Sequence, residues 1–171
     1  MDQLFAPWRL EFIKGKRPDG CVFCTLPAER ALARENLVLH HGKRAFIIMN
    51  RYPYTPGHLL VVPNRHTSDF VSLTREENEE ISLLLQSSMR ALSEIYRPEG
   101  FNFGMNLGAA AGAGIREHLH WHIVPRWIGD TNFLPVMTGV RSIPELLLDG
   151  YDRLVPLMEL RGRSADQKGS V

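Results

Sequence analysis

Histidines occupy every second position of one short run, at His118, His120 and His122, and bulky apolar residues fill the positions between them. In a helix, side chains two positions apart point to different sides, whereas in a strand they share one face. The run therefore predicts a β-strand over residues 118–124, with an apolar side against a core and three imidazoles on the opposite side. Successive side chains on that face lie roughly 7 Å apart, close enough for all three rings to line one ligand.

A row of imidazoles on a strand face has three interpretations. The histidines can be polar residues on the solvated side of a sheet, they can form a tridentate metal site, or one neutral imidazole can attack an electrophilic phosphorus while its neighbours orient it. Residues 108–114, a run of glycine and alanine only, come shortly before the histidines. Three histidines in register beside such a run favour a ligand-binding site over a solvated face, and the metal and nucleophile interpretations both stay open at this point.

The size and charge of the chain limit the classes of function. With 171 residues it is expected to form one domain. Its 20 basic and 19 acidic side chains leave a net charge of +1, which argues against a protein that binds nucleic acid through a broad basic surface. The N-terminus lacks the pattern of a secretory signal, and the longest apolar runs are too short to span a membrane. We therefore expect a cytoplasmic protein with no nucleic-acid or membrane partner.

Short β-prone runs and one long amphipathic segment predict the other elements of the fold. Thr74 and Glu77 fit a helix capping box, and apolar residues recur at helical spacing after it, which predicts a helix over residues 75–96. A second helix is expected from near Ser142, kinked or shortened by Pro156. Further strands are predicted at residues 38–40, 45–49, 58–62 and 101–107.

Together these elements predict an α+β domain with a five-stranded, mostly antiparallel sheet, a long central helix and a C-terminal helix. Residues 1–35 contain scattered prolines and glycines and are expected to be irregular and to pack on the domain. Residues 161–171 are expected to form a disordered tail. His58 follows Pro56 and Gly57 at the start of the third strand, where we expect either a histidine that supports the triple-histidine run by a hydrogen bond or an ordinary core histidine.

Cys21 and Cys24 are the only cysteines of the sequence and form a C-x-x-C pair. Such a pair can be half of a zinc site, a redox pair or a coincidence. A redox pair requires a strand before it and a helix after it, whereas the residues on both sides of this pair are typical of a loop. A zinc site requires two more ligands, which the pair by itself does not identify.

The run over residues 118–124 resembles the signature of the histidine triad family, in which histidines alternate with apolar residues and a further apolar residue follows. Asn50, the run Pro-Gly-His-Leu-Leu-Val-Val-Pro at residues 56–63 and the segment Phe-Gly-Met-Asn at residues 103–106 resemble other parts of that family. Residues 125–133, together with the cysteine pair, are similar to its bacterial branch of diadenosine tetraphosphate phosphorylases.

The resemblance extends over residues 5–160 and implies a histidine triad (HIT) domain over residues 36–160 that forms a homodimer. It implies that His120 is the nucleophile and forms a covalent nucleotidyl-imidazole intermediate, while His118 and His122 on either side orient the ring and stabilise charge. Residues with an amide side chain or an open backbone are implied to bind the ribose or the phosphates of the substrate: Asn50, Asn106, Gly112, Ala113 and Gly114.

Similar family members also hold a structural zinc ion. The resemblance implies that Cys21 and Cys24 are joined by His66 and His118, a Cys2His2 set that is common in closed structural sites. Under this assignment His118 is a metal ligand rather than a helper of the nucleophile. The chemistry itself is expected to need no metal, because backbone N–H groups, arginine and histidine can stabilise the developing charge.

The expected function is nucleotidyl transfer or hydrolysis on a dinucleoside polyphosphate such as diadenosine tetraphosphate, with phosphate or water as the acceptor. Two alternatives use the same residues differently. A nucleoside phosphoramidate hydrolase would have the same nucleophile and a different leaving-group pocket. A zinc-stabilised module without catalytic activity would bind a nucleotide and not turn it over.

Overall fold

A computed structural model describes residues 20–130 and 145–166, with side chains of the last helix described up to Met158. Five strands form one sheet in the order β1-β2-β3-β5-β4, and every neighbouring pair is antiparallel. The predicted α+β fold with a five-stranded antiparallel sheet is confirmed. The strands are β1 (Val38–His41), β2 (Ala45–Met49), β3 (Leu59–Pro63), β4 (Gly100–Gly104) and β5 (Trp121–Arg126).

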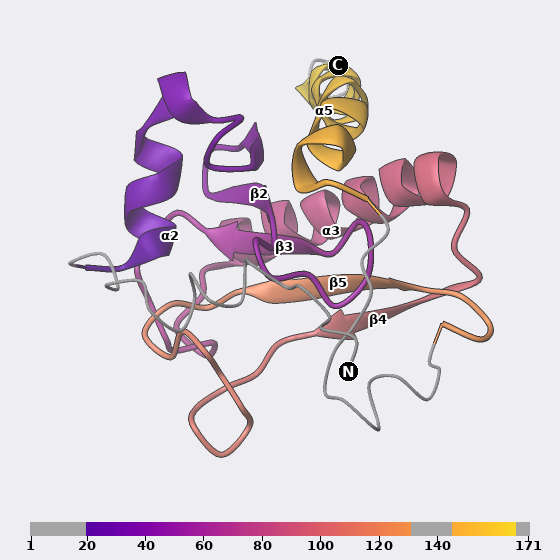
Figure 1. The fold of residues 1–171 in the computed structure, drawn as a ribbon. Helices are drawn as coiled ribbons and strands as arrows, with labels where there is room; N and C mark the ends of the chain where they lie inside the picture. The colour runs from indigo at the N-terminus through magenta and orange to yellow at the C-terminus, as the bar shows by residue number, and fades with distance from the viewer. Residues whose placement is uncertain (1–19, 131–144, 167–171) are drawn as a thin grey trace.

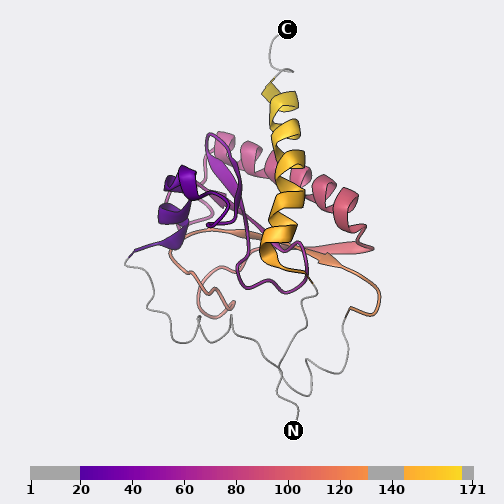
Figure 2. The same ribbon diagram turned by 45° about the horizontal axis from the view of Figure 1, so that its top comes forward.

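Two long helices cover the sheet. The helix α3 (Arg75–Tyr96) contacts β2, β3 and β5, and the helix α5 (Leu147–Asp166) lies against α3 and β1 (Figure 1). Seen from above, α5 crosses over α3 (Figure 2). Every residue of β2 and of β3 is buried, as is Leu92 of α3. Burial of each such aliphatic side chain contributes about 1.5–3 kcal/mol, so this layer is the main source of stability and fixes the strands that carry the site.

The central helix begins and ends for local reasons. The Thr74 hydroxyl accepts a hydrogen bond from the Glu77 N–H, and the Glu77 carboxylate accepts one from the Thr74 N–H, so the predicted capping box is present. The predicted bounds of residues 75–96 are confirmed. After Tyr96, the backbone of Arg97 adopts a left-handed conformation with φ of 46°, and its N–H still bonds the carbonyl of Ser93.

Two strand boundaries differ from the prediction by three residues, and the other strand ends agree to within two. β5 begins at Trp121 rather than at residue 118, and β4 ends at Gly104 rather than at residue 107. The reason is the register: Gly104 pairs with His122, so the two strands separate beyond that pair and the chain on both sides leaves the ladder. β1 extends one residue past the predicted end at residue 40, and both His40 and His41 are half-buried.

The two ends of the chain also differ in part from expectation. Within the segment expected to be irregular, residues 22–32 form the short helix α2 (Val22–Thr25) and the turns η1 (Leu26–Ala28) and η2 (Arg30–Leu32). α5 begins at Leu147, after the expected start near Ser142, a residue that lies outside the described part of the chain.

The C-terminal helix continues through its proline. Pro156 does not shorten α5, because buried Leu154 and Met158 on either side of it anchor the helix to the core. The helix reaches Asp166, residues 167–171 lie outside the described residues, and the disordered tail over residues 161–171 stays a prediction. In the part of the chain that the structure describes, no helix has both the length and the apolar character needed to cross a membrane.

Replacement of Gly57 by alanine is expected to destabilise the fold by about 2–4 kcal/mol. Gly57 has φ of +72°, and a Cβ atom there would lie 2.8 Å from Leu92 Cδ2 and 2.9 Å from Tyr96 Cε2. Gly129→Ala is the matched control, because Gly129 has a similar φ of +79° and nothing within 4 Å of the added atom. Urea unfolding measures both. Equal losses would show that the backbone conformation, rather than the contact with α3, makes glycine necessary.

Candidate active site and metal centre

The three histidines of the run diverge to different partners. β5 starts after His120, so only His122 takes part in the strand ladder. The segment leading into β5 is held by a backbone hydrogen bond of 2.8 Å from the Leu119 N–H to the carbonyl of Thr67. Leu119 is buried as predicted, and so are His118 and His120, at 1% and 7% exposure. Of the three imidazoles expected on one face, the His118 ring turns toward the cysteine pair, whereas the rings of His120 and His122 lie next to each other with centroids 5.0 Å apart.

A backbone carbonyl determines which nitrogen of the neutral His120 ring carries the hydrogen. Its Nδ1 lies 2.9 Å from the carbonyl oxygen of His118. A carbonyl oxygen can only accept, so Nδ1 carries the hydrogen and donates it, and in the neutral ring Nε2 holds the lone pair. Burial lowers the pKa of His120 below its usual range. At neutral pH, His120 is therefore an uncharged imidazole with one nitrogen ready to act as a nucleophile or base.

His122 receives a hydrogen bond from His58, with 2.9 Å between His58 Nε2 and His122 Nδ1. The Tyr54 backbone N–H donates to His58 Nδ1 at 3.1 Å, so the hydrogen of neutral His58 resides on Nε2. His58 Nε2 then donates to His122 Nδ1, and the hydrogen of neutral His122 must be on Nε2. His58 is 1% exposed, and its predicted supporting role is confirmed. This chain of donors makes His122 a proton donor beside the neighbouring ring of His120, whose centroid is 5.0 Å away.

Asn50 belongs to the same network. Its Oδ1 accepts from the Tyr52 backbone N–H at 2.9 Å, which orients the amide so that Nδ2 lies 3.3 Å from His58 Nδ1. The contact of Asn50 with a ribose, implied by the family resemblance, stays a prediction. Within the described structure the residue supports His58, a contact that sequence reasoning missed.

The histidine pair is expected to make the protein sensitive to acid. Burial is the first cause that lowers the pKa of His58 to about 3 and that of His122 to about 4. The unfolded chain, with a histidine pKa of about 6.5, binds more protons, so stability is complete above about pH 6.5 and falls toward pH 4 by up to about 1.4 kcal/mol per pH unit for each ring. Urea unfolding at a series of pH values measures this slope.

A His58→Asn/His122→Asn double variant is the control for that slope. It is expected to lose stability less steeply than the wild type over the same range. Both proteins keep the cysteine cluster, so the pH dependence of that cluster cancels in the comparison. Equal slopes would show that the two rings do not stay neutral in the folded protein.

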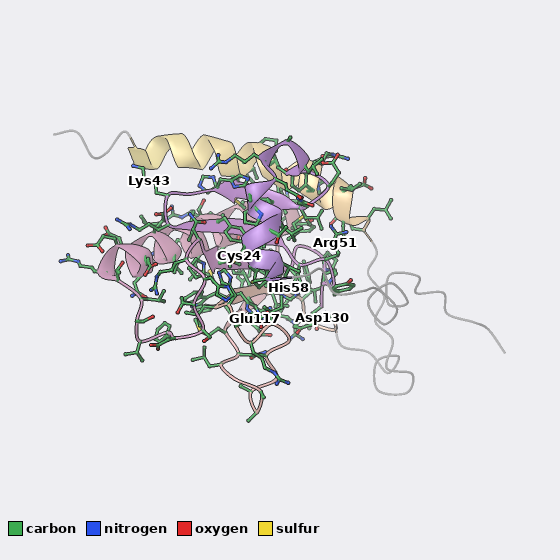
Figure 3. All side chains as sticks on the ribbon, turned by 90° about the vertical axis from the view of Figure 1, so that its left-hand side faces the viewer. Cys24, Lys43, Arg51, His58, Glu117 and Asp130 are labelled. Carbon is green, nitrogen blue, oxygen red and sulfur yellow. The ribbon has the colours of Figure 1, made fainter. Side chains whose placement is uncertain are left out.

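A second cluster lies next to the first. The ligand atoms of Cys21, Cys24, His66 and His118 all lie within 4.8 Å of one another. His118 Nδ1 is 3.3 Å from Cys21 Sγ and 3.6 Å from Cys24 Sγ. His66 Nδ1 is 3.4 Å from Cys24 Sγ. Figure 3 views the protein from the side that carries α2, with Cys24 and His58 labelled near the centre. The structure thus brings together the four residues that were predicted as metal ligands.

The cluster fits a tetrahedral zinc ion in its donor atoms, spacing and support. Zinc bonds of about 2.0–2.3 Å place two ligand atoms of a tetrahedron about 3.3–3.8 Å apart, which matches the sulfur–nitrogen distances here. His118 Nε2 donates to the carbonyl of Pro63 at 2.8 Å, which leaves Nδ1 with the lone pair and turned toward the thiols. Neither cysteine forms a disulfide.

The loop that carries His66 is braced against the central helix. The guanidinium of Arg65 donates to both carboxylate oxygens of Glu77 at 2.9 Å, and to the carbonyl of Ser72. Glu77 is 5% exposed, and its hydrogen bonds with Arg65 lower its pKa to about 2. The capping residue of α3 therefore also holds the loop that bears a candidate ligand.

Two aromatic rings pack on the histidines and were missed by sequence reasoning. Phe23, from α2, has its ring centroid 5.6 Å from that of His118 and 5.1 Å from that of His120. Tyr54 has its ring centroid 4.6 Å from that of His58. Phe23 lies between Cys21 and Cys24, so the sequence could have indicated its position. If both cysteines bind one metal ion, the turn between them directs the enclosed side chain toward the other ligands.

The residues that the family resemblance implies for phosphate binding make no described contact with the histidines. Asn106, Gly112 and Gly114 are exposed, and in the described residues no hydrogen bond joins them to the histidines. The N–H groups of Gly112 and Ala113 donate within the loop, to the carbonyls of Ala109 and Gly108. The contact of all these residues with a substrate stays a prediction, and for the N–H groups of Gly112 and Ala113 it would require these loop hydrogen bonds to be exchanged.

Relatives with named activities share the region that contains the site. The chain is 47% identical over 115 residues to the AP-4-A phosphorylase of Mycobacterium tuberculosis, a match that spans 67% of this chain and 59% of that protein. It is 33% identical over 136 residues to the bis(5'-adenosyl)-triphosphatase of Saccharomyces cerevisiae, spanning 77% of this chain and 60% of that protein. The chain thus covers less than two thirds of the length of either relative.

A solved structure and a family model also match the chain. The fold is similar to that of a Zn-bound histidine triad family protein from Mycobacterium smegmatis, with a TM-score of 0.63, 26% identity, and coverage of 85% of this chain and 97% of that chain. Residues 33–127, more than half of the 171 residues, match the HIT domain. With its triple-histidine run, its antiparallel sheet and these matches, the chain belongs to the HIT domain family.

Proposed function

We propose that the protein transfers or hydrolyses nucleotidyl groups of dinucleoside polyphosphates, with His120 as the nucleophile. The observation that carries this proposal is the hydrogen bond from His120 Nδ1 to the His118 carbonyl, because it leaves the Nε2 lone pair of a neutral ring for attack. The names of the two relatives supply the substrate class, since both refer to adenosine polyphosphates.

The reaction proceeds in two displacements. His120 Nε2 attacks the phosphorus of one adenylyl group of diadenosine tetraphosphate and forms a P–N bond. The P–O bond between this phosphorus and the rest of the polyphosphate breaks, and its electron pair leaves on the oxygen of ATP. An oxygen of phosphate or water then attacks the same phosphorus, and the electron pair of the P–N bond returns to Nε2. His122 gives its Nε2 proton to the leaving oxygen and recovers one from the acceptor.

The acceptor decides between two activities. With phosphate the products are ATP and ADP, and with water they are ATP and AMP. The higher identity to the phosphorylase than to the triphosphatase, 47% against 33%, favours phosphate. A nucleoside phosphoramidate hydrolase remains the alternative enzyme, because it would use the same nucleophile.

We also propose that Cys21, Cys24, His66 and His118 hold one structural zinc ion. The proposal is supported by the spacing of the four ligand atoms and by the Pro63 carbonyl that fixes the His118 tautomer. Bound zinc would join α2 to the loop after β3 and to the segment before β5. The role of the His118 side chain is then ligation, and its contribution to His120 is made by its carbonyl oxygen.

The homodimer and the cytoplasmic location stay predictions. β4 lies at the edge of the described sheet, and its Phe103 is 62% exposed, which leaves a strand edge open to a second copy. Sedimentation of the purified chain tests this.

Trapping the covalent intermediate tests the proposed function. The protein is mixed with diadenosine tetraphosphate labelled in the adenylyl groups, quenched in alkali, and examined by intact mass and peptide mapping. Phosphoramidates of histidine are stable in base and labile in acid, so one AMP added to the peptide containing His120, lost on acidification, is the expected result. Release of the label as ADP when phosphate is added, rather than as AMP, would identify a phosphorylase.

Other outcomes identify the alternatives. Turnover of an adenosine phosphoramidate without turnover of the dinucleotide would assign the alternative substrate. Nucleotide binding without label on the protein and without turnover of either compound would indicate a binding module and would contradict the proposal.

A further inference from the structure

The metal cluster and the candidate nucleophile share a buried side chain. Phe23 is the buried residue of α2 and is 4% exposed. Its ring meets that of His118 edge-on, at 82° and 5.6 Å between centroids, and tilts over that of His120 at 48° and 5.1 Å. The ring therefore touches a candidate metal ligand and the candidate nucleophile at once.

The position of Phe23 depends on the two cysteines beside it. α2 is four residues long, with the N–H groups of Cys24 and Thr25 bonded back to the carbonyl of Cys21. So short a helix has no stability of its own in water. Besides the packing of Phe23 and the partly buried Val22 on the core, α2 is linked to the rest of the described structure by the approaches of the two sulfur atoms to His66 and His118. A metal bound by these four residues would close the links and fix the backbone that presents Phe23.

The His120 ring needs a second constraint. The bond from Nδ1 to the His118 carbonyl fixes one atom of the ring, but the ring can still pivot about that bond and swing Nε2 away from a line of attack. Phe23 packs against the ring and removes that freedom. The displacement of a reacting group by about 1 Å can cost about 100-fold in rate, so a packing contact of this kind is large enough to matter.

We propose that Phe23 is a positioning residue for His120 and that it couples the state of the Cys21–Cys24 metal site to the rate of nucleotidyl transfer. The proposal rests on the proposed function for the identity of the nucleophile. Metal loss would release α2, withdraw the Phe23 ring and leave the His120 ring loosely held, with the substrate-binding residues unaffected.

A double perturbation tests the coupling. The wild type and Phe23→Leu, which keeps an apolar side chain and loses the ring, are each assayed with diadenosine tetraphosphate as purified and after treatment with a chelator. Phe23→Leu is expected to retain one zinc per chain and a KM within about threefold of the wild type, with kcat reduced about 10- to 100-fold. Chelation should reduce kcat of the wild type by a similar factor and of Phe23→Leu by little more, because both act through the same contact.

Two controls keep the test decisive. Val22→Ala changes the neighbouring residue of α2, which also packs on the core, and should leave kcat near the wild-type value. Phe23→Met replaces Phe23→Leu if the latter does not melt cooperatively. Multiplicative losses of kcat from chelation and substitution, or a change confined to KM, would overturn the proposal.

A spectroscopic readout separates this proposal from the proposed function. In protein labelled with ¹⁵N-histidine, the ring signals of His120, assigned by their absence in His120→Gln, are expected to shift or broaden on chelation and in Phe23→Leu, and to stay in place in Val22→Ala. Unmoved signals would overturn the positioning role even in an active enzyme. Signals that move in a protein without turnover would support the contact while the proposed function fails.

Discussion

His120→Ala is expected to lower the turnover of diadenosine tetraphosphate by about 10⁴-fold or more, the order seen when an enzyme loses a covalent nucleophile. The reason is that burial lowers the pKa of His120 and so keeps its ring neutral, while the Nδ1 bond to the His118 carbonyl leaves the lone pair on Nε2. The nitrogen lone pairs of His58 and His122 are each occupied by a donor, Tyr54 N–H and His58 Nε2–H respectively, so neither ring can replace it. Steady-state kinetics with product analysis measures the loss.

Binding distinguishes this result from misfolding. The variant should bind a nonhydrolysable dinucleotide analogue with a Kd within a few-fold of the wild type, by calorimetry. His40→Ala, which removes a half-buried histidine of β1 away from the site, is the matched control and should keep full activity. Residual activity above about a tenth of the wild type would mean that another group attacks phosphorus.

Removal of the metal is expected to lower the melting temperature by about 8–16 °C. A ligand that binds only the folded state, present at about 1,000 times its Kd, stabilises by about 4 kcal/mol, and in a domain of this size each kcal/mol corresponds to about 2–4 °C. The cost arises because Cys21 and Cys24 would no longer tie α2 to the loop of His66 and to the start of β5. Differential scanning calorimetry with and without a chelator, and metal analysis of protein purified without added zinc, measure it.

Substitution of a ligand provides the comparison. Cys21→Ser should melt near the chelated wild type and should not respond to chelator. Thiol titration of the native wild type should find both cysteines protected until the metal is removed. A metal content near zero with both thiols freely titratable would sink the zinc proposal.

The sequence was most informative where local chemistry determines structure. Thr74 and Glu77 predicted the start of α3 correctly, because a capping box depends only on two residues three positions apart. The strand boundary in the histidine run was harder to predict. The alternation indicates an extended backbone, and Leu119 is buried as expected. An extended segment, however, need not be hydrogen-bonded as a strand. Whether residue 118 lies in the ladder is set by where β4 separates from β5, at the pair of Gly104 and His122.

The sequence could not predict which groups donate and which accept in the hydrogen bonds of the site. Which nitrogen of His120 carries a proton follows from the carbonyl that lies beside it, and the same holds for His118 and Pro63. The His58–His122 bond joins residues 64 positions apart across β3 and β5. Such pairs are determined by sheet register, which a single sequence does not contain. The family resemblance pointed to the four candidate metal ligands, which the structure brings together, because a resemblance reflects the shared fold of related chains.

The spread of those ligands along the chain has a consequence for biosynthesis. Cys21 and His118 are separated by 97 positions. A growing chain that has exposed its thiols therefore has to wait for nearly a hundred more residues before its fourth ligand leaves the ribosome. Until His66 emerges the two thiols are half of the candidate site, and until His118 emerges the site still lacks one of its four ligands. Because the segment that completes the cluster also carries His120, the candidate metal site and the proposed nucleophile are completed in the same late event.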